Sequence, residues 1–222
     1  MKKLSEITNW QEMIKEVVQG DCLEGMKMIP DKSIDLVVTD PPYGIKINRI
    51  SNNFGSSVHL SRKATNDDWD DNIPSKEIFE EIFKISKNQI VFGANYFWQY
   101  FYATQCYIIW DKRGELPKVP FCDTEFAWTS FNKMSRKYTV INHGFVRDSK
   151  KMRQHPTQKP LELIRKILLD FTEEGDLVCD PFMGSWTTAR ACKDLKRNFM
   201  GFELEEKYCQ IGEERLRQQN LF

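Results

Sequence analysis

Ile34-Asp-Leu-Val-Val-Thr-Asp40 is an apolar, β-branched run that ends in an acid and continues as Pro41-Pro42-Tyr43. β-Branched residues favour strands, whereas proline cannot donate to the hydrogen-bond ladder of a central strand. We therefore expect a buried strand that ends at Asp40 and leads into a stiff turn. The carboxylate of Asp40 would then stand at the carboxyl end of that strand.

Short apolar runs of the same kind recur along the chain, and most of them are followed by a helical pattern. Strands are expected at 16–21, 89–93, 107–111, 124–130, 176–180 and 198–203, and helices at 76–86, after Pro160, at 187–195 and at 204–218. Strands that alternate with helices indicate parallel βαβ units and a sheet covered on both faces. The sequence therefore predicts an α/β fold.

Acidic residues close four of the expected strands, namely Asp21, Asp40, Asp180 and Glu203. Ligands of parallel α/β sheets bind beyond the carboxyl ends of the strands. Each acid alone could be a helix cap or a turn residue. Four acids at four strand ends, however, form the pattern of a binding site.

Composition limits the class of protein. The chain has 222 residues, of which 41% are hydrophobic and 29% are charged, as in a globular protein. We expect a single domain over residues 1–222. Lys and Arg together number 32, as do Asp and Glu, so the net charge neither favours nor excludes a polyanionic partner.

The six cysteines stand singly, without CxxC pairs or histidines at zinc spacing. This pattern favours reduced thiols in the cytoplasm and no structural metal. The first residues lack the apolar segment of a signal peptide. The uncharged stretch 90–110 is long enough for a membrane span, but polar residues and Gly93 interrupt it. We expect a strand, a short helix and a second strand there, all in the core.

The turn after Asp40 is suited to holding an amino group. A carboxylate and a peptide carbonyl fixed by two prolines can accept both hydrogens of an exocyclic NH2, which frees its lone pair. Tyr43 would offer a stacking face for a base that has left its duplex. The alternative is an ordinary Pro-Pro turn with an exposed Asp40 and a core Tyr43, and this stretch alone does not separate the two.

Cys179-Asp-Pro-Phe-Met-Gly-Ser-Trp-Thr-Thr188 has the pattern of a strand, a glycine-bearing turn and a helix start. Such a turn lets a small charged cofactor approach the backbone and the positive end of the helix. Glu203 follows at the distance expected of a carboxylate that binds ribose hydroxyls. An ordinary βα turn with an acid at a strand end is the alternative.

His155-Pro-Thr-Gln-Lys-Pro160 precedes an expected helix. Thr157 and Lys159 could bind a carboxylate at the start of that helix. A polar helix cap with an exposed lysine would read the same way.

Together these motifs resemble the beta group of DNA amino-methyltransferases. Asp40-Pro-Pro-Tyr43 matches the catalytic motif of that family, the loop from Asp180 resembles its S-adenosylmethionine loop, and His155–Pro160 resembles a further cofactor motif. The motif order is circularly permuted, as in that group. The resemblance implies a Rossmann-like methyltransferase fold with a mostly parallel, seven-stranded sheet. It also implies that Asp180, Glu203, Asp21 and Asp40 follow one another along one rim.

The resemblance assigns residues to two roles. The implied catalytic residues are Asp40, Pro41, Pro42 and Tyr43. The implied cofactor-binding residues are Asp21, Asp180, Phe182, Gly184, Ser185, Thr187, Glu203, Thr157 and Lys159. The implied reaction is direct transfer of the methyl group of S-adenosylmethionine to a flipped-out base in double-stranded DNA, without a metal.

An Asp at the first motif position is similar to the adenine-N6 members of the family, so adenine is expected before cytosine N4. RNA is an alternative substrate. A nucleotide-dependent oxidoreductase is the weakest alternative, because the loop at 182–186 has too few glycines and Asp40–Tyr43 would have no role.

Trp186 departs from the family pattern, which usually has a second glycine there. An indole at this position could clash with the cofactor, fill its pocket or turn outward. The corresponding alternatives are a tolerated variant, a catalytically impaired DNA-binding homologue or an introduced substitution.

Two basic segments are expected to form loops that contact DNA, near 44–66 and 131–155. The candidate phosphate contacts are Arg136, Lys137, Arg147, Lys150 and Arg153. A solvated charged loop is the alternative for each of them. A homodimer, a partner endonuclease of a restriction–modification system and a prokaryotic or phage origin complete the expectations.

Overall fold

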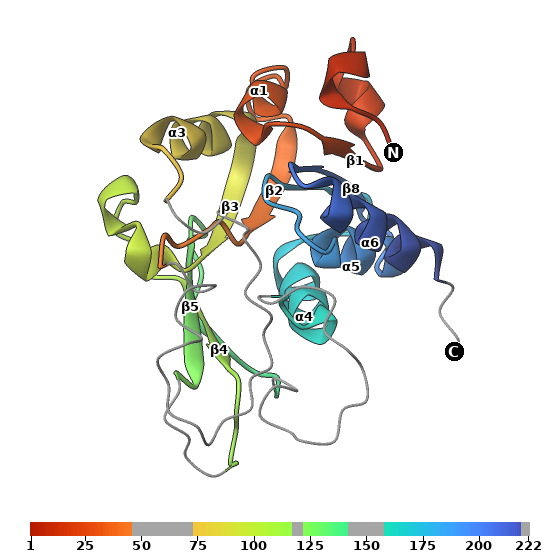
Figure 1. Ribbon diagram of the computed structural model, residues 1–222. Helices are drawn as coiled ribbons and strands as arrows, with labels where there is room; N and C mark the ends of the chain where they lie inside the picture. The colour runs from red at the N-terminus through yellow and green to blue at the C-terminus, as the bar shows by residue number, and fades with distance from the viewer. Residues whose placement is uncertain (46–72, 117–121, 142–157, 219–222) are drawn as a thin grey trace.

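The computed structural model describes residues 1–45, 73–116, 122–141 and 158–218. These residues form one eight-stranded sheet with helices on both faces (Figure 1). The strand order is β1-β8-β7-β2-β3-β5-β4-β6. In chain order the strands are β1 (Glu16–Gln19), β2 (Ile34–Thr39), β3 (Ser86–Phe92), β4 (Tyr107–Asp111), β5 (Thr124–Thr129), β6 (Arg136–Thr139), β7 (Leu177–Asp180) and β8 (Asn198–Glu203).

The sheet is mostly parallel, because β5 alone among the described strands runs against its neighbours β3 and β4. The predicted α/β class and parallel sheet are confirmed, but the count of seven strands is wrong. The eighth strand, β6, lies within the segment that we expected to be a loop at 131–155. Its sequence Arg-Lys-Tyr-Thr shows no apolar run, since only Tyr138 is buried.

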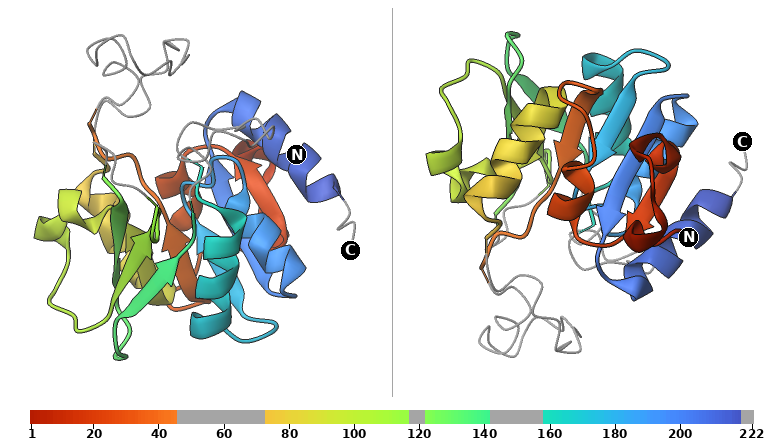
Figure 2. Two further views of the ribbon diagram at one scale, coloured as in Figure 1. Left: turned by 90° about the horizontal axis from the view of Figure 1, so that it is seen from below. Right: turned by 90° about the horizontal axis from the view of Figure 1, so that it is seen from above.

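Helices cover the two faces of the sheet in two groups (Figure 2). On one face lie α1 (Cys22–Met26) and α3 (Lys76–Ile85); on the other lie α4 (Leu161–Phe171) and α5 (Thr187–Asp194). The last helix, α6 (Glu206–Arg217), packs against α5, β1 and β8. Short 3-10 turns are η1 (Leu4–Glu6), η2 (Trp10–Met13), η4 (Ala94–Tyr96) and η5 (Trp98–Tyr100).

The amphipathic helices α3 and α4 form where the apolar spacing predicts them. In α3 the buried side chains include Phe79, Ile82 and Ile85, which recur every three residues and so share one face. In α4 the buried residues are Leu163, Ile164, Ile167, Leu168 and Phe171. Pro160 precedes α4, as expected for a residue that cannot donate a backbone hydrogen bond.

Residues 86–111 form β3, η4, η5 and β4, which confirms the strand, short helix and strand expected there. The expectation that the whole stretch lies in the core is wrong, because Tyr96, Trp98 and Tyr102 between the two strands are exposed. Within the described ranges no helix has the length and apolar character needed to cross a membrane.

The sheet topology brings the four strand-end acids to one rim. Because β1, β8, β7 and β2 are adjacent and parallel, their carboxyl ends point the same way, in the order Asp21, Glu203, Asp180 and Asp40. The expected order, with Asp21 beside Asp40, is wrong. The nearly continuous burial of β2 puts that strand inside the sheet between β7 and β3, whereas β1 is an edge strand.

A test of this packing is the replacement of Phe79 in α3. Its buried ring contacts Phe97, Tyr100 and Phe101, so Phe79→Ala leaves a cavity under the turns that follow β3. We expect the free energy of unfolding in urea to fall by about 3–5 kcal/mol. The control is Glu80→Ala on the exposed face of the same helix, where the loss of its ion pair with Lys76 should cost no more than about 0.5 kcal/mol. Equal effects of the two changes would contradict the assigned core.

Candidate active site

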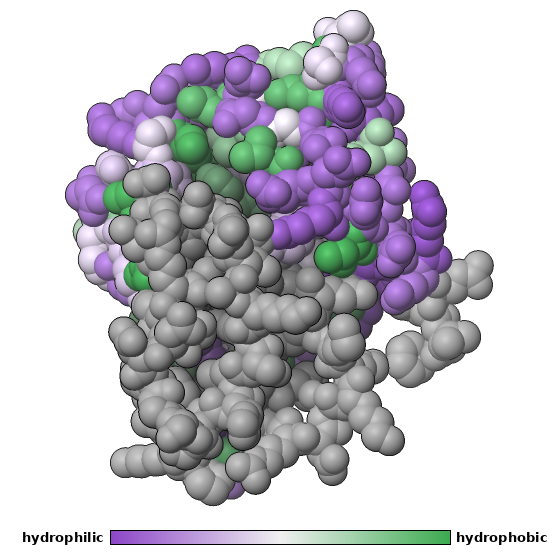
Figure 3. Space-filling view, in the orientation of Figure 1, coloured by the Kyte–Doolittle hydropathy of each residue, from purple (hydrophilic) through white to green (hydrophobic). Residues whose placement is uncertain are grey.

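A cavity of about 510 Å³ lies at the carboxyl ends of β1, β8, β7 and β2. In the space-filling view, apolar side chains gather on the surface between α3 and α6, whereas the surface over α6 is largely hydrophilic (Figure 3). Of the residues expected to be catalytic, Asp40 and Pro42 line this cavity, whereas Pro41 and Tyr43 are not part of its lining. Eight of the residues expected to bind a cofactor line it as well. Its lining includes Asp21, Asp40, Pro42, Lys159, Asp180, Phe182, Gly184, Ser185, Thr187 and Glu203.

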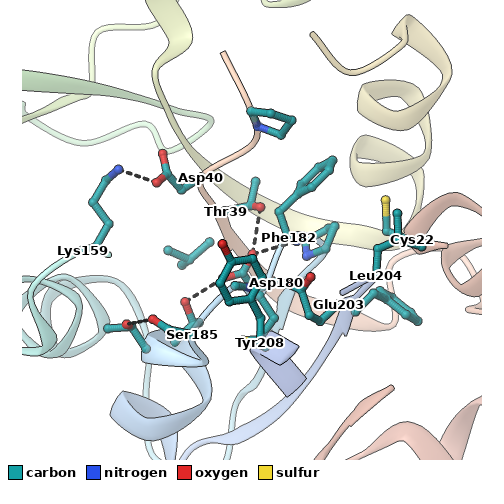
Figure 4. Close-up of a pocket in the computed structure, with 18 of the residues that line it drawn as sticks. Cys22, Thr39, Asp40, Lys159, Asp180, Phe182, Ser185, Glu203, Leu204 and Tyr208 are labelled. Carbon is teal, nitrogen blue, oxygen red and sulfur yellow. Dashed lines mark hydrogen bonds and ion pairs between the residues drawn. The ribbon is translucent and has the colours of Figure 1, made fainter. Parts of the chain in front are cut away.

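The cavity has two ends (Figure 4). Asp40 and Lys159 lie at one end, and Cys22, Glu203 and Leu204 lie at the other. Asp180 lies between them, at the end of β7. The site can therefore hold one elongated molecule along the rim of the sheet and a second group beside Asp40.

Both carboxylate oxygens of Asp40 have protein partners. Tyr43 donates its hydroxyl to Oδ1 at 2.5 Å, and Lys159 donates to Oδ2 at 2.5 Å. Burial raises the pKa of Asp40, against the opposing effect of Lys159. The carboxylate at the end of β2 is therefore held in a fixed position by the segment that precedes α4.

Lys159 also contacts Glu125 of β5 at 3.1 Å, and Glu125 in turn pairs with Lys112 at 2.5 Å. Burial lowers the pKa of Lys159, but the two carboxylates outweigh it and hold the pKa above its ordinary value. For Glu125, burial acts to raise the pKa, yet the two lysines hold it below its ordinary value. The result is a chain of alternating charges that runs from Asp40 to Lys112.

Tyr43 packs against the turn after β3. Its ring stacks on Tyr96, with centroids 4.8 Å apart and planes 15° apart. Gly93 makes this possible, because a Cβ there would lie 2.0 Å from the Tyr43 ring and because its φ of +67° suits glycine. The ring is thus held at the catalytic end by an aromatic cluster, and its role as a stacking face for a base stays a prediction.

Asp180 ties three elements of the cavity wall together. Its Oδ1 accepts from Thr39 of β2 at 2.8 Å and from the Phe182 amide at 3.1 Å, and its Oδ2 accepts from Thr188 of α5 at 2.7 Å. Burial raises its pKa to about 6. Through these hydrogen bonds Asp180 fixes the shape of the loop that begins at Pro181.

Glu203, at the end of the neighbouring strand β8, forms hydrogen bonds with that loop. Its Oε2 accepts from the Gly184 amide at 2.7 Å and its Oε1 from the Glu205 amide at 2.9 Å. Burial raises the pKa of Glu203 to about 7. Each carboxylate oxygen can accept a further hydrogen bond, so Glu203 suits a pair of ligand hydroxyls in the cavity.

Asp21 begins α1 at the far end of the rim. Its Oδ1 accepts from the amides of Leu23 and Glu24 at 2.8 and 3.1 Å, as in a helix N-cap. The residue also lines the cavity. The capping and binding interpretations of this acid therefore coexist in the structure.

Trp186 turns away from the cavity. Its side chain is 3% exposed and it is not part of the lining. Its φ of 60° and ψ of 34° lie in the left-handed region, which explains why glycine suits this position. The indole packs against Gly212 of α6, where a Cβ would lie 2.1 Å from the ring. The bulk of Trp186 therefore fills a space behind the loop.

The residues expected to contact DNA are only partly described. Arg136 and Lys137 are exposed on β6, and Lys137 pairs with Asp111 at 2.9 Å. Thr157, Arg147, Lys150 and Arg153 lie outside the described residues, as does most of the segment expected as a loop at 44–66. Pro41 is buried beside the cavity without being part of its described lining.

Sequence reasoning missed several residues that build the site. Thr39 and Thr188 support Asp180, Glu125 and Lys112 complete the charged chain, and Arg215 of α6 contacts the loop. The threonines flank recognised motifs and could have been found from that position. The other three come from distant elements and had no signal of spacing.

Comparison with solved structures identifies the fold. The M1.HpyAVI–SAM complex aligns with a TM-score of 0.59 at 24% identity, over 91% of this chain and 98% of that chain. PvuII DNA methyltransferase (cytosine-N4-specific) aligns with a TM-score of 0.62 at 18% identity, over 93% of this chain and 88% of that one. The fold is that of the Rossmann-like DNA methyltransferases.

Residues 102–214, about half of the chain, match the profile of the N6/N4 DNA methylase family, to which this protein therefore belongs. Type II methyltransferase M.HinfI of Haemophilus influenzae is 27% identical over 95% of this chain and 70% of its own length. Type II methyltransferase M2.MboI of Moraxella bovis is 28% identical over 90% and 86%. The resemblance expected from the motifs is confirmed.

The raised pKa of Glu203 predicts a pH dependence of ligand binding. Neutral Glu203 contributes to the free energy of unfolding, and this contribution is lost as pH rises through about 7. Ligand binding has the opposite pH dependence, because only the ionised carboxylate accepts hydrogen bonds from two ligand hydroxyls. The affinity for S-adenosylhomocysteine, measured by calorimetry, should therefore rise by about tenfold from pH 6 to pH 8. Glu203→Gln should bind more weakly with a flatter profile, whereas Glu206→Gln, an exposed control, should keep the rise. A steep rise that persists in Glu203→Gln would show that another group is responsible.

Proposed function

We propose that this protein is a site-specific DNA methyltransferase that uses S-adenosylmethionine to methylate adenine N6. The observation that carries the proposal is the shared cavity, which is lined by Asp40 and Pro42 of the catalytic motif and by the loop from Asp180 together with Glu203. Methyl transfer requires the donor and the acceptor to meet in one place, and proximity of this kind supplies much of the catalysis.

The lining fits S-adenosylmethionine in its chemistry. Glu203 offers carboxylate oxygens to ribose hydroxyls, and apolar side chains such as Phe182, Phe202 and Leu204 suit an adenine ring. Of the implied cofactor residues, eight share this lining and Thr157 lies outside the described residues. When bound, the cofactor supplies a methyl group on a sulfonium, a reactive electrophile.

The acceptor side follows from the turn after β2. The Asp40 carboxylate and the Pro41 carbonyl accept the two hydrogens of the exocyclic amine, which frees the nitrogen lone pair for attack. Tyr43 and Lys159 each occupy one position on the Asp40 carboxylate, which has room for about four hydrogen bonds. Lys159 also offsets the negative charge of Asp40, so this carboxylate orients and polarises the amine. The contribution of the protein is then mainly positioning and electrostatics.

The choice of adenine rests on Asp40 at the first position of its motif, by resemblance to adenine-specific members of the family. A base in this site must leave the duplex, and Tyr43 is the ring proposed to stack on it. The exposed Arg136 and Lys137 are candidates for phosphate contacts. Type II methyltransferases among the relatives support a site-specific enzyme of a restriction–modification system.

An indole at position 186, where the family usually has glycine, could impair the enzyme by blocking the cofactor. Because the indole packs behind the loop on Gly212, its bulk leaves the described cavity open. An active enzyme is therefore the better-supported alternative.

The direct test is to incubate the protein with methyl-labelled S-adenosylmethionine and unmethylated DNA, and to identify the labelled nucleoside. We expect N6-methyladenine. Asp40→Asn should abolish labelling, because the amide cannot offset the positive charge that develops on the amine. Asp31→Asn, which alters an exposed carboxylate before the opposite end of β2, is the matched control and should retain it.

Label in N4-methylcytosine would keep the mechanism and correct the base. Label in RNA but not in DNA would correct the polymer. A folded protein that labels no nucleic acid from several sources would overturn the proposal.

A further inference from the structure

Arg215 of α6 reaches the back of the cofactor loop. Its Nη1 lies 2.9 Å from the Ser185 carbonyl, 3.2 Å from Ser185 Oγ and 2.9 Å from Thr187 Oγ1. The side-chain carbonyl of Gln158, in the amide orientation that satisfies both groups, accepts from the same guanidinium at 3.0 and 2.9 Å. Ser185, Thr187 and Gln158 all line the cavity.

Packing fixes Arg215 in this position. One turn before it on α6, Gly212 leaves the space that Trp186 fills, so the loop and the helix meet at a single distance. Arg190 of α5 donates to the Arg215 and Gln218 carbonyls at 2.9 and 2.5 Å, which holds the end of α6. The guanidinium is therefore held at the loop from both sides.

The charge of Arg215 has no carboxylate partner among the described residues, all of its polar contacts there being neutral oxygens. Arg215 is half-buried, and burial together with the nearby Arg190 lowers its pKa to about 10, against a smaller opposing effect of Asp194, so it is still a cation at neutral pH. Buried charges are usually paired, because an isolated one is costly. An unpaired guanidinium behind a cavity wall therefore favours an anion on the other side of that wall.

Lys159 is not available for this purpose in the structure. Its ammonium lies between Asp40 and Glu125, which together more than balance its charge. The other positive group near Ser185 is the N-terminal end of α5, which begins at Thr187. Arg215 and the start of α5 thus mark one part of the cavity as positive, while the charges at the Asp40 end are paired with one another.

We propose that Arg215 is a positioning residue that makes this part of the cavity selective for the carboxylate of the cofactor's amino-acid portion. The inference rests on the proposed function and deepens it. Arg215 acts through Ser185, Thr187 and Gln158, whose hydroxyl and amide groups it orients, and through its own unpaired charge. The match with the family profile ends at residue 214, one residue before Arg215.

The test compares two ligands that differ in the anionic portion. S-Adenosylhomocysteine carries the amino-acid group, and methylthioadenosine lacks it while keeping the adenosine. We expect the wild type to prefer the first ligand and Arg215→Gln to lose at least about tenfold of that preference, with little change for methylthioadenosine. Arg215→Lys should retain more of the preference than Arg215→Gln, because it keeps the charge.

Arg217→Gln is the matched control, since Arg217 lies on the same helix but is 77% exposed and pairs with Glu213. The Arg217→Gln variant should prefer S-adenosylhomocysteine over methylthioadenosine to the same extent as the wild type. An unchanged preference in Arg215→Gln would overturn the inference while leaving the proposed function intact. Equal loss of both ligands would also overturn it, because that result describes a loop that has collapsed. A wild type that binds neither ligand would overturn the proposed function and this inference together.

A larger side chain at position 212 would test the packing between α6 and the loop that holds Arg215 in place. Gly212→Ala collides with the indole, so both ligands should bind more weakly, and Trp186→Gly added to Gly212→Ala should recover part of the loss. Unchanged affinities in Gly212→Ala would show that the Trp186–Gly212 contact does not position the loop.

Discussion

A buried ion pair between Asp40 and Lys159 joins segments that lie 119 residues apart in the chain. Lys159 is 8% exposed, and its ammonium also contacts Glu125, so removing it would leave two carboxylates facing each other with little solvent. A charge buried in this way is tolerated only when paired. This pairing joins the turn after β2, the segment before α4 and strand β5 at the cavity.

The rest of the cavity follows from the neighbouring strand ends. Asp180 accepts a hydrogen bond from the Phe182 amide of the loop and links it to Thr39 of β2 and Thr188 of α5. Glu203 accepts a hydrogen bond from the Gly184 amide of the same loop. On the back of the loop, α6 contributes the Trp186–Gly212 contact and Arg215. Three layers of contacts therefore shape one short segment, which is what a binding loop needs to be ordered before its ligand arrives.

Local patterns predicted much of this architecture. The apolar run at 34–40, the helix faces of α3 and α4 and the motif order were enough for the fold class and for ten of the residues that line the cavity. Strand β6 was missed because Arg136–Thr139 buries a single side chain. The predicted order of the acids along the rim was wrong, because the residues of one strand do not indicate which other strands will be its neighbours in the sheet. Glu125 and Arg215 could not be predicted, since their roles arise only when β5 and α6 meet the loops.

Asp40 and Lys159 stabilise each other as an ion pair at the end of β2. The most direct measurement is a double-mutant cycle of unfolding free energies with Asp40→Asn, Lys159→Gln and the double variant. Lys159→Gln leaves Asp40 without its partner and should cost about 3–5 kcal/mol. Asp40→Asn should cost less, because Lys159 keeps its contact with Glu125. The double variant should cost less than the sum of the two by about 1–3 kcal/mol. Costs that add to within about 0.5 kcal/mol would show that the two charges do not interact and would contradict the account.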